Sequence, residues 1–559
     1  MSKLNFKNKF IKYTTIIIVL IITIVVYYNF AVRINPPVVS NISAIKLERK
    51  EITKNIYTCD KSWFKKNGVG LWELYLEGDD FELGAKNGIL TKELVKFQEV
   101  AFIESLKKMV PSESYLKFLK YFIAWFNRNI DDYIPLEYQK EIYGISFNAS
   151  PEFNYISTPY HRLLNYHGAH DIGHAVQNMS LVKCTAFGVK GNRSEDGSII
   201  VGRNMDFYVG DDFAKNKIVA FYKPKRGHKF SMITWGGMIG VISGMNDQGL
   251  TITLNSAAAK IPTSAKTPVS ILARQILQYA STINEAYAIA KRTKLFVAEC
   301  FFVSSAKDNQ FAIIEKTPDS TAIYQEKDDD LILTNHFQSI NLKNTEDNLK
   351  SINESASLYR YNRVKELLDR KEKHDVNSFA EILRNQKGKA DANIGMANEK
   401  AVNQLIAHHS IIFMPNKLKF WISTGPYPLG SYICYDLNKV FSDSLNILSN
   451  IFDSDLTIPA DTFLNSNTYE KFKQYKLLTL KLEQSIKDKN IKNFSNEMIS
   501  NYLQLNPEFF YPYYLSGEYY RIKGDKQNAL KNYNIALTKE IPKKSERDLI
   551  LKAIEKTNN

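Results

Sequence analysis

MIGVISGMNDQGLTITLN (residues 238–255) has the pattern that decides the fold class of this chain. Its apolar residues, many of them β-branched, recur with a two-residue period, which is typical of β-strands. Turn-forming residues (Asn246, Asp247 and Gly249) divide the stretch, so its two halves are predicted to pair as a β-hairpin. Further strand patterns flank it on both sides: GSIIVGRN (197–204), KFSMITW (229–235), CFFVSS (300–305), QFAIIEK (310–316), STAIYQ (320–325) and LILTNHF (331–337).

Helical patterns precede and interrupt these strands. Residues 84–145 carry apolar residues at three- and four-residue spacings. Two further helices are predicted to begin at Thr267-Pro268 and at Thr282, where Glu285 completes a capping-box pattern. Strands, two helices and then more strands predict an α+β domain in which sheets cover one another and helices lie outside.

The composition excludes several classes of protein. With 559 residues, 44% of them apolar and 24% charged, the chain is a globular protein of roughly three to four domains, not a disordered polymer. Lys and Arg exceed Asp and Glu by 73 to 59, but the excess is mostly Lys spread along the chain, so nucleic acid is not a predicted partner. A disulfide scaffold is excluded because only four cysteines occur: Cys59, Cys184, Cys300 and Cys434.

Residues 13–32 are predicted to cross a membrane. They contain no charge, and 20 residues at 1.5 Å rise span a hydrocarbon core of about 30 Å. A cleaved signal peptide is the main alternative, although its apolar region is normally shorter and followed by a small-x-small site. Four lysines lie between residues 3 and 12 before the span, whereas Arg33 is the only basic residue just after it. The positive-inside rule therefore predicts a single-pass anchor with the chain beyond residue 33 outside the cytoplasm.

The region beyond about residue 440 is predicted to be a helical tail without strands. Residues 510–542 match a 34-residue tetratricopeptide repeat when Gly517 is its eighth position, with Ala529 and Ala536 at small positions. Gly524-Asp525 supplies the turn between the two helices. A plain helical hairpin is the alternative, and both readings assign the tail to packing or to docking of a protein partner.

Five motifs occur in a fixed order between residues 183 and 363. A cysteine before an apolar strand is most often a buried small side chain, an RxxD pair is usually an ion pair, and a strand-ending Asn is usually a turn former. Their combination and order are what indicate chemistry. The motifs are KCTAFG (183–188), GRNMD (202–206), MNDQGLTITLN (245–255), LTNHF (333–337) and SLYRYNR (357–363).

Taken together, these motifs resemble the cysteine N-terminal-nucleophile (Ntn) hydrolases. The branch is that of choloylglycine hydrolases, acyl-coenzyme A:6-aminopenicillanic acid acyltransferases and the autoproteolytic acyltransferases of peptidase family C45. The resemblance covers roughly residues 60–440 and includes HSIIFMPNKLKFWISTGPYPLG (409–430), which looks like the closing strands of that branch. It implies a four-layer αββα sandwich that needs no metal and no organic cofactor.

The resemblance also implies that the protein cuts its own Lys183–Cys184 bond, which leaves Cys184 as a new N-terminus. The thiolate is the competent nucleophile, and a thiol of pKa about 8.5 is mostly protonated at neutral pH. The freed α-amine has a pKa of about 7.7–8.0, so it accepts the thiol proton and later returns it to a leaving amine. Nucleophile and base then belong to one residue, and no catalytic His is required.

By the same resemblance, the other motifs supply the polar wall of the site. Asp206 would hold the α-amine, and Arg203 would set the charge around the thiolate. Asn255 would donate its side-chain N–H to the oxyanion, Asn335 would orient the nucleophile or substrate, and Arg360 would complete the wall.

Two geometric points stay open in the sequence. Residues i and i+3 of a regular strand face opposite sides, so Arg203 and Asp206 converge only if the strand ends or bends there. Arg363 lies one helical turn beyond Arg360 and is the alternative arginine, although Arg360 has the family's spacing from the preceding Ser.

A histidine cluster lies just before the predicted cut. His161, His167, His170, Asp171 and His174 fall close together, and the last three histidines are spaced to share one face of a helix and bind a metal. Two intervening glycines weaken such a helix. We therefore expect no metal here, and favour packing against the precursor's active site or contacts with the substrate or the processing site.

The sequence thus predicts a membrane-anchored, extracytoplasmic hydrolase or acyltransferase that acts on amide C–N bonds of a small acyl-amide substrate. Closeness to a bilayer favours a lipid-like acyl group. The alternative is an inactive, membrane-anchored scaffold whose repeats dock a partner. A papain-like protease is disfavoured because Cys184 precedes a strand and lacks that family's flanking pattern. The predicted segments are 1–12 (cytoplasmic), 13–32 (anchor), 33–60 (spacer), 61–183 (helical pro-region), 184–440 (catalytic domain) and 441–559 (helical tail).

Overall fold

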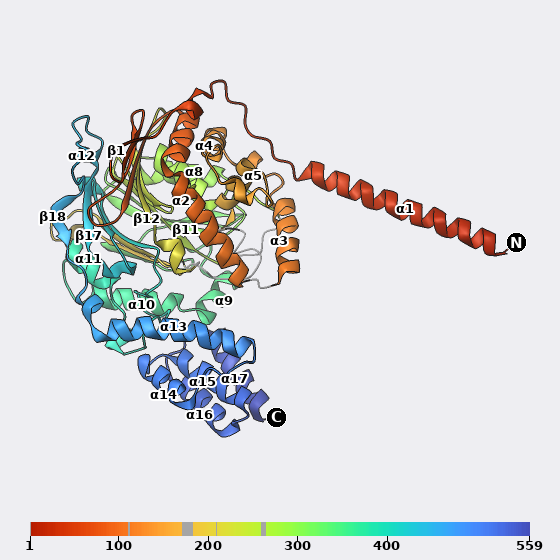
Figure 1. Cartoon of the computed structure of the whole chain (residues 1–559). Helices are drawn as coiled ribbons and strands as arrows, with labels where there is room; N and C mark the ends of the chain where they lie inside the picture. The colour runs from red at the N-terminus through yellow and green to blue at the C-terminus, as the bar shows by residue number, and fades with distance from the viewer. Residues whose placement is uncertain are drawn as a thin grey trace.

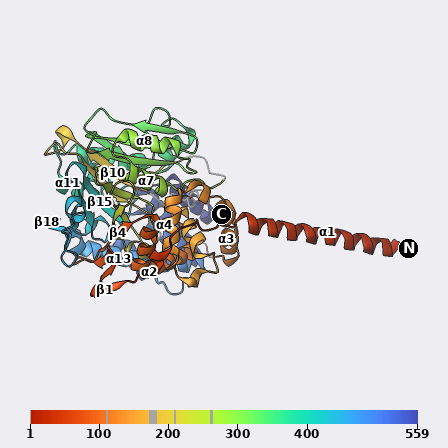
Figure 2. The same ribbon diagram turned by 90° about the horizontal axis from the view of Figure 1, so that it is seen from above.

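The computed structural model describes residues 2–109, 112–169, 171, 183–207, 210–258 and 264–558. Figure 1 shows two β-sheets surrounded by helices, a helical tail packed against this body, and a long N-terminal helix that projects away from it. The projecting helix, α1 (Ser2–Ala31), also points away from the body when it is seen from above in Figure 2.

The larger sheet contains strands from both sides of the predicted cut. Its neighbours pair antiparallel except β4 and β7, which are parallel. In spatial order its described strands are β1 (Lys50–Thr53), β2 (Ile56–Cys59), β3 (Ser62–Lys66), β4 (Trp72–Gly78), β7 (Ile218–Pro224), β8 (Phe230–Thr234), β9 (Ser243–Asn246), β10 (Leu250–Ser256), β11 (Glu299–Ser305), β12 (Gln310–Lys316) and β13 (Thr321–Tyr324).

The predicted hairpin is present in the larger sheet. Strands β9 and β10 pair antiparallel, with Met245 opposite Thr251. Gly249 in the connecting turn has a φ of 75°, a conformation that glycine adopts without steric cost. The sequence prediction of a turn at this position is therefore confirmed.

The smaller sheet carries the predicted nucleophile. Its strands are antiparallel throughout, and β5 begins directly after Cys184. In spatial order its described strands are β14 (Asp330–Leu333), β5 (Thr185–Val189), β6 (Ile200–Met205), β15 (His409–Met414), β16 (Lys419–Ser423), β17 (Tyr432–Asp436) and β18 (Asp453–Ile458).

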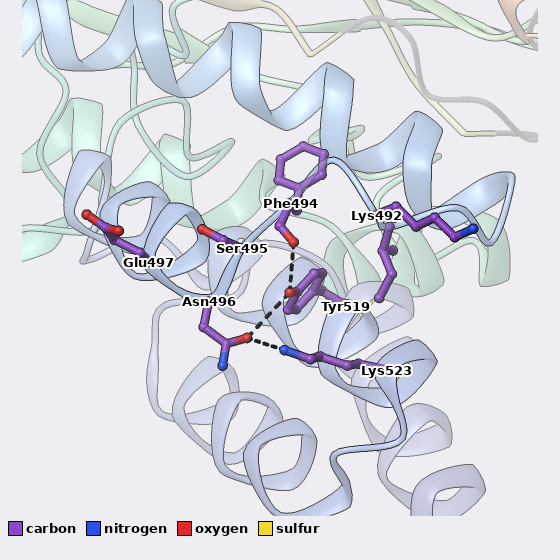
Figure 3. Close-up of a pocket in the computed structure, with 8 residues that line it drawn as sticks. Lys492, Phe494, Ser495, Asn496, Glu497, Tyr519 and Lys523 are labelled. Carbon is purple, nitrogen blue, oxygen red and sulfur yellow. Dashed lines mark hydrogen bonds between the residues drawn. The ribbon is translucent and has the colours of Figure 1, made fainter.

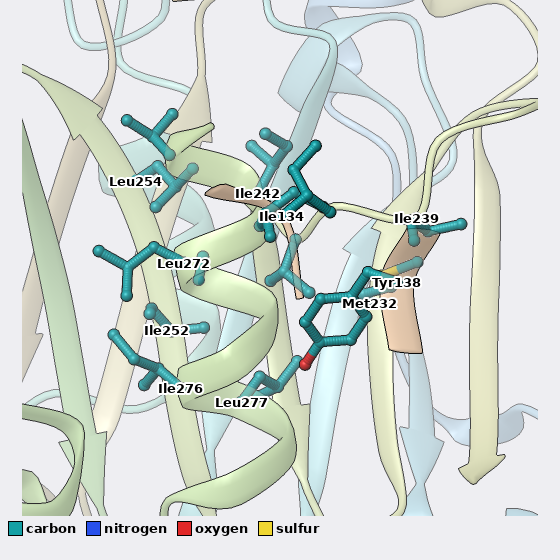
Figure 4. Packing of buried hydrophobic residues seen from close by; sticks show 14 of the residues in the cluster. Ile134, Tyr138, Met232, Ile239, Ile242, Ile252, Leu254, Leu272, Ile276 and Leu277 are labelled. Atoms are coloured by element: carbon teal, nitrogen blue, oxygen red, sulfur yellow. The ribbon is translucent and has the colours of Figure 1, made fainter. Parts of the chain in front are cut away.

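Helices cover the outer face of the larger sheet. Figure 4 shows Leu272 and Ile276 of α7 packed against Ile252 and Leu254 of β10, with Tyr138 of α4 beside them. Burial of these side chains is the main contribution of this layer to stability, at about 25 cal/mol per Å² of apolar surface. The helices of this side are α2 (Asp80–Met109), α3 (Glu113–Phe126), α4 (Leu136–Ser146), α5 (Pro159–His167), α7 (Val269–Tyr279) and α8 (Ile283–Arg292).

The two sheets pack on each other through a second apolar cluster. Phe221 and Phe302 of the larger sheet meet Ala186, Ile411 and Phe420 of the smaller one. Every residue of β5, β6, β8, β10 and β11 is buried, since neither face of these strands reaches solvent.

Helices on the far side of the smaller sheet complete the layers. Phe379 of α11 stacks on Phe187 of β5 with ring centroids 4.7 Å apart, and Val364 of α10 joins the same cluster. The order helix, sheet, sheet, helix is the four-layer αββα arrangement expected from the sequence. The helices in this part of the chain are α9 (Glu346–Glu354), α10 (Ser357–Leu368), α11 (Val376–Leu383) and α12 (Leu437–Val440).

The tail is helical and has its own apolar core. Helices α15 and α16 form an antiparallel hairpin in which Gly517 lies against the ring of Tyr533, and Gly524 ends α15 with a φ of 83°. The structure thus contains a helical hairpin at the predicted position, while its assignment to tetratricopeptide repeats stays a prediction. The tail helices are α13 (Asn467–Lys487), α14 (Asn496–Leu505), α15 (Phe510–Lys523), α16 (Lys526–Thr538) and α17 (Lys544–Asn558).

Three details differ from the sequence analysis. The predicted spacer and helical pro-region contain β1–β4, which extend the larger sheet. Strands β2–β4 contribute buried apolar side chains to its core, whereas every residue of β1 is exposed. The predicted tail begins with β18, which pairs with β17, so the smaller sheet runs past residue 440. Helix α7 has Pro268 and not Thr267 as its N-cap, whereas the capping box of Thr282 and Glu285 is present as predicted.

Candidate active site

Cys184 and Arg203 lie together on neighbouring strands. Strands β5 and β6 pair with Ala186 opposite Arg203, which brings the arginine back to the start of β5. Nη2 of Arg203 donates to Sγ of Cys184 at 3.2 Å and to the carbonyl oxygen of Leu254 at 2.6 Å. Burial raises the pKa of the Cys184 thiol, and the charge of Arg203 opposes this rise. Cys184 is completely buried, so the uncut chain does not expose its thiol to solvent.

Ser243 and His409 hold the other side of the Arg203 guanidinium. Nη1 of Arg203 donates to Oγ of Ser243 at 2.7 Å and lies 3.3 Å from Nε2 of His409. Burial and the nearby Arg203 charge lower the pKa of His409 well below its usual value, so its ring is neutral. The sequence analysis missed both residues, because they come from β9 and β15, far from Arg203 along the chain.

Asp206 lies just beyond the end of β6, whose last residue is Met205. This resolves the open geometric point, since the regular strand ends before Asp206. Its Oδ2 accepts a hydrogen bond of 3.1 Å from Nε2 of Gln404, whereas Oδ1 has no hydrogen-bond partner in the described part of the chain. Burial raises the pKa of Asp206 to about 7, although the charges of Arg360 and Arg203 act in the opposite direction.

Asn255 is fixed in a different way from the predicted one. It follows Leu254 on β10, but its Nδ2 donates to the carbonyl oxygens of Thr334 at 2.9 Å and of Leu333 at 3.3 Å. Its Oδ1 is buried without a hydrogen-bond partner among the residues described. In the uncut chain the amide nitrogen is therefore engaged, and Asn255 is not a free oxyanion donor.

Asn335 and Arg360 form a bonded pair beside the nucleophile. Nη2 of Arg360 donates to Oδ1 of Asn335 at 2.6 Å, and Nε of Arg360 lies 3.3 Å from Oγ1 of Thr185, the residue after the nucleophile. Asn335 Nδ2 donates to the carbonyl oxygen of Ser256 at 3.0 Å. Oγ of Ser357 at the start of α10 accepts from the backbone N–H of Asn335 at 2.8 Å.

Arg363, the alternative arginine, faces a different part of the protein. It donates to Glu366 at 2.8 Å and to Asp391 at 2.6 Å. Of the two arginines, Arg360 is the one that contacts Asn335 and Thr185, and its role in the site stays a prediction.

Residues around Lys183 hold the bond that is predicted to break. The backbone N–H of Lys183 donates to the carbonyl oxygen of Asp206 at 2.9 Å. The carbonyl oxygen of Lys183, which belongs to the Lys183–Cys184 peptide bond, accepts from Nε2 of Gln404 at 2.9 Å. The Lys183 ammonium forms an ion pair with Glu399. Gln404 and Glu399 carry no motif, so the sequence analysis had no signal for them.

The histidine cluster does not form a metal site in the described part of the chain. His170 and His174 lie outside the described residues. His167 on α5 is buried, with Nδ1 2.8 Å from the carbonyl oxygen of Leu163 and Nε2 accepting from the backbone N–H of Ile239 at 3.0 Å. Burial lowers the pKa of His167 to about 4. No group of three or more potential ligands suited to a metal is found among the residues described.

A surface pocket of about 590 Å³ lies in the tail, away from the predicted site residues. Figure 3 shows Tyr519 and Lys523 of α15 directed toward Asn496, with Nζ of Lys523 2.7 Å from its Oδ1. The Tyr519 hydroxyl donates to the carbonyl oxygen of Phe494 at 3.1 Å, and none of the predicted site residues lines the pocket.

Known proteins are similar to the part of the chain that contains the candidate active site. Residues 192–426 match the model of the acyl-coenzyme A:6-aminopenicillanic acid acyl-transferase family. The chain is 24% identical over 321 residues to an uncharacterised protein of Archaeoglobus fulgidus, covering 51% of this chain and 53% of that protein. It is 25% identical over 232 residues to the N-acylethanolamine-hydrolyzing acid amidase of Caenorhabditis elegans, covering 39% of this chain and 61% of that enzyme. The chain thus spans little more than half of the length of these relatives.

Two solved structures are similar to part of the chain. The ortholog of N-acylethanolamine-hydrolyzing acid amidase from Caenorhabditis elegans is 19% identical, covers 42% of this chain and 93% of its own, and has a TM-score of 0.29. The conjugated bile acid hydrolase of Clostridium perfringens is 13% identical, covers 46% of this chain and 93% of its own, and has a TM-score of 0.32.

Proposed function

We propose that this chain is a cysteine Ntn enzyme, because its residues 192–426 match the model of the acyl-coenzyme A:6-aminopenicillanic acid acyl-transferase family. It cleaves or transfers acyl groups at amide C–N bonds after cutting its own Lys183–Cys184 bond. The single observation that carries the proposal is the arrangement at this bond. Gln404 holds the carbonyl oxygen of Lys183 on one side, and Arg203 holds the sulfur of Cys184 on the other.

Self-cleavage proceeds by an acyl shift from nitrogen to sulfur. The Cys184 sulfur attacks the carbonyl carbon of Lys183, the C–S bond forms, and the C–N bond breaks as the nitrogen takes up a proton. Water then hydrolyses the thioester, which leaves a carboxylate on Lys183 and a free thiol and α-amine on Cys184. Gln404 Nε2 already lies 2.9 Å from the oxygen on which negative charge develops, a position in which such donors lower a barrier by about 3–4 kcal/mol.

The freed α-amine is the base for turnover. Its pKa of about 7.7–8.0 suits proton transfer near neutral pH. Asp206 would hold it as an ammonium, since Oδ1 of Asp206 is buried and lacks a hydrogen-bond partner among the described residues. The Cys184 thiolate attacks the substrate carbonyl, an acyl-thioester forms and the amine leaves. Water or a second amine then takes the acyl group.

The remaining motif residues would position the reacting groups. Arg360 and Asn335 form a rigid pair next to Thr185, which supports a role in orienting the nucleophile or the substrate. Asn255 becomes an oxyanion donor if its amide turns away from the Leu333 and Thr334 carbonyls once the site opens.

Intact mass spectrometry of the purified full-length chain tests the proposal. Wild type is expected to give two chains, the larger starting at Cys184, and Cys184→Ala is expected to remain whole. An uncut wild-type chain would instead favour the inactive scaffold. The cleaved protein is then assayed with N-acylethanolamines and other long-chain acyl amides, and release of the free amine is measured. These substrates are chosen because the similar Caenorhabditis elegans enzyme is an N-acylethanolamine-hydrolyzing acid amidase.

We further propose that α1 anchors the catalytic region at a membrane and outside the cytoplasm. Within the described residues, one helix is long and apolar enough to span a bilayer, Phe10–Ala31, with a mean hydropathy of 2.3 and no burial. At its end, Tyr28 stacks on Trp125 of α3, and its hydroxyl donates to the carbonyl oxygen of Tyr121 at 2.7 Å. Fractionation of cells tests the anchor, while N-terminal sequencing separates it from a cleaved signal peptide.

The tail would then carry the tetratricopeptide-like hairpin as a docking module for a protein partner. The supporting observations are the close contact of Gly517 with Tyr533 and the burial of Ala529 and Ala536 between the helices. The corresponding test is a pull-down of partner proteins. It compares the wild-type hairpin with a variant in which the charges on the hairpin surface are reversed.

A further inference from the structure

The tail holds one loop of the catalytic region from two sides. We call residues 394–405 the junction loop. Asn506, between α14 and α15, exchanges two hydrogen bonds of 2.9 Å with the backbone N–H and carbonyl oxygen of Met396. Nδ2 of Asn398 donates to the carbonyl oxygen of Glu540, between α16 and α17, at 2.9 Å. The conformation of the junction loop therefore depends on the tail.

The other side of the junction loop contacts the bond that is predicted to break. Gln404 near its end donates to the Lys183 carbonyl oxygen, and the carboxylate of Glu399 in its middle pairs with the Lys183 ammonium. The same Glu399 oxygen lies 2.9 Å from Nζ of Lys543, which directly precedes α17. The backbone carbonyl of Glu399 also accepts from Nη1 of Arg360 at 2.8 Å.

The Glu399 carboxylate is stabilised by the two lysine ammonium groups beside it. Burial disfavours the Glu399 carboxylate, but the ammonium groups of Lys183 and Lys543 outweigh burial and lower the pKa of Glu399. A largely buried carboxylate between two ammonium groups is stabilised only while both partners stay in place. The residue on the acyl side of the bond is thus fixed by a charge that the tail itself helps to hold.

We propose that the tail promotes self-cleavage in cis: Lys543 holds Glu399, and Glu399 holds Lys183 so that the Lys183 carbonyl stays between Gln404 and Cys184. Glu399 and Lys543 are positioning residues, because neither contacts the sulfur or the carbonyl group that react. The inference rests on the proposed self-cleavage and gives the tail an intramolecular role besides any docking of a partner.

The test measures the rate of self-cleavage of the full-length chain by intact mass, starting from protein collected early after expression. Glu399→Gln is expected to slow cleavage by about 10- to 100-fold, the effect of losing one charge-assisted hydrogen bond. Lys543→Met is expected to slow self-cleavage as well, by a smaller factor. Lys543→Arg keeps the positive charge and is expected to cleave at the wild-type rate.

Two controls separate positioning from folding. Lys544→Met changes the next residue, which is exposed and lies 3.8 Å from Glu354, and is expected to cleave like wild type. Molecules of Lys543→Met that have been cleaved are expected to turn over an amide substrate with unchanged kcat and KM, since Lys183 takes no part in turnover and Lys543 acts on it only from the tail. Cleavage of Glu399→Gln and Lys543→Met at the wild-type rate would overturn the inference, as would equal losses of cleavage and turnover. Failure of wild type to cleave at all would instead refute the proposed function.

Discussion

Nη2 of Arg203 lies 3.2 Å from the sulfur of Cys184, and the same nitrogen donates to the carbonyl oxygen of Leu254 at 2.6 Å. One guanidinium thus ties the nucleophile at the start of the smaller sheet to β10 of the larger sheet. It is also the nearby positive charge that opposes the rise in the thiol pKa caused by burial.

Replacement of Arg203 by Lys is expected to slow both self-cleavage and alkylation of Cys184 in the cleaved protein. A lysine ammonium cannot contact the Cys184 sulfur, the Leu254 carbonyl oxygen and the Ser243 hydroxyl at the same time. Both rates are therefore expected to fall by about 10- to 100-fold. The alkylation rate measured against pH should show a higher thiol pKa. Arg193→Lys, on the turn between β5 and β6, is the matched control, and an equal effect of both variants would contradict the assignment.

Arg360 and Arg363 offer a direct comparison within one helix. Arg360→Lys breaks the fork to Asn335 and Thr185, and we expect it to reduce cleavage and turnover by about 100-fold. Arg363→Lys loosens ion pairs with Glu366 and Asp391 and is expected to lower stability by about 1–2 kcal/mol while leaving the rates near wild type. The measurements are the cleavage and turnover rates and the melting temperatures of both variants. Slower cleavage and turnover in Arg363→Lys, with near wild-type rates in Arg360→Lys, would identify Arg363 as the functional residue.

Asp206 should make the stability of the uncut protein depend on pH. Its pKa is about 7 in the folded chain, because burial disfavours the carboxylate, against about 3.9 when unfolded. Between these values the folded state retains a proton that the unfolded chain has released. The free energy of unfolding is therefore expected to fall as pH rises from 4 to 7, by about 1.4 kcal/mol per pKa unit.

Thermal unfolding of Cys184→Ala across this pH range is the measurement, since that variant stays uncut. Adding Asp206→Asn should flatten the curve, whereas adding Asp212→Asn, which alters an exposed carboxylate nearby, should not. A pH dependence that survives Asp206→Asn would assign it to other groups.

The helical hairpin of the tail depends on Gly517. A Cβ at this position would lie 2.3 Å from the Tyr533 ring, so Gly517→Ala is expected to destabilise the tail by about 1–3 kcal/mol through overpacking. Limited proteolysis should then cut between α15 and α16 more rapidly. Asn534→Ala, on the exposed face of α16, serves as the control with a change within about 0.5 kcal/mol.

The sequence predicted most of the strands and helices, whereas the roles assigned to the motif residues stay predictions. The two-residue period identified the strands from residue 197 onward, and the resemblance to the Ntn hydrolases is confirmed by the family match over residues 192–426. The structure brings Arg203 to Cys184 and Arg360 to Asn335, as the motif order suggested. β1–β4 and β18 escaped prediction, because they join the edges of sheets whose partners lie elsewhere in the chain.

The supporting residues of the site could not be found from the sequence. Gln404, Glu399, Ser243 and His409 lie outside the five motifs, and each reaches its partner from an element distant along the chain. The amide of Asn255 shows the same limit. Its residue type suggested an oxyanion donor, whereas packing turns its nitrogen toward Leu333 and Thr334.

Local patterns in the sequence predicted the strands from residue 197 onward, the tail hairpin and the apolar N-terminal helix, because period, turn residues and capping are properties of neighbouring residues. The packing of distant segments determines which side chains surround the Lys183–Cys184 bond, and it brings the tail to this bond through Lys543 and Glu399. The physical reason is that hydrogen bonds and ion pairs form between atoms close in space, and two sheets packed face to face bring together residues that local rules leave unrelated.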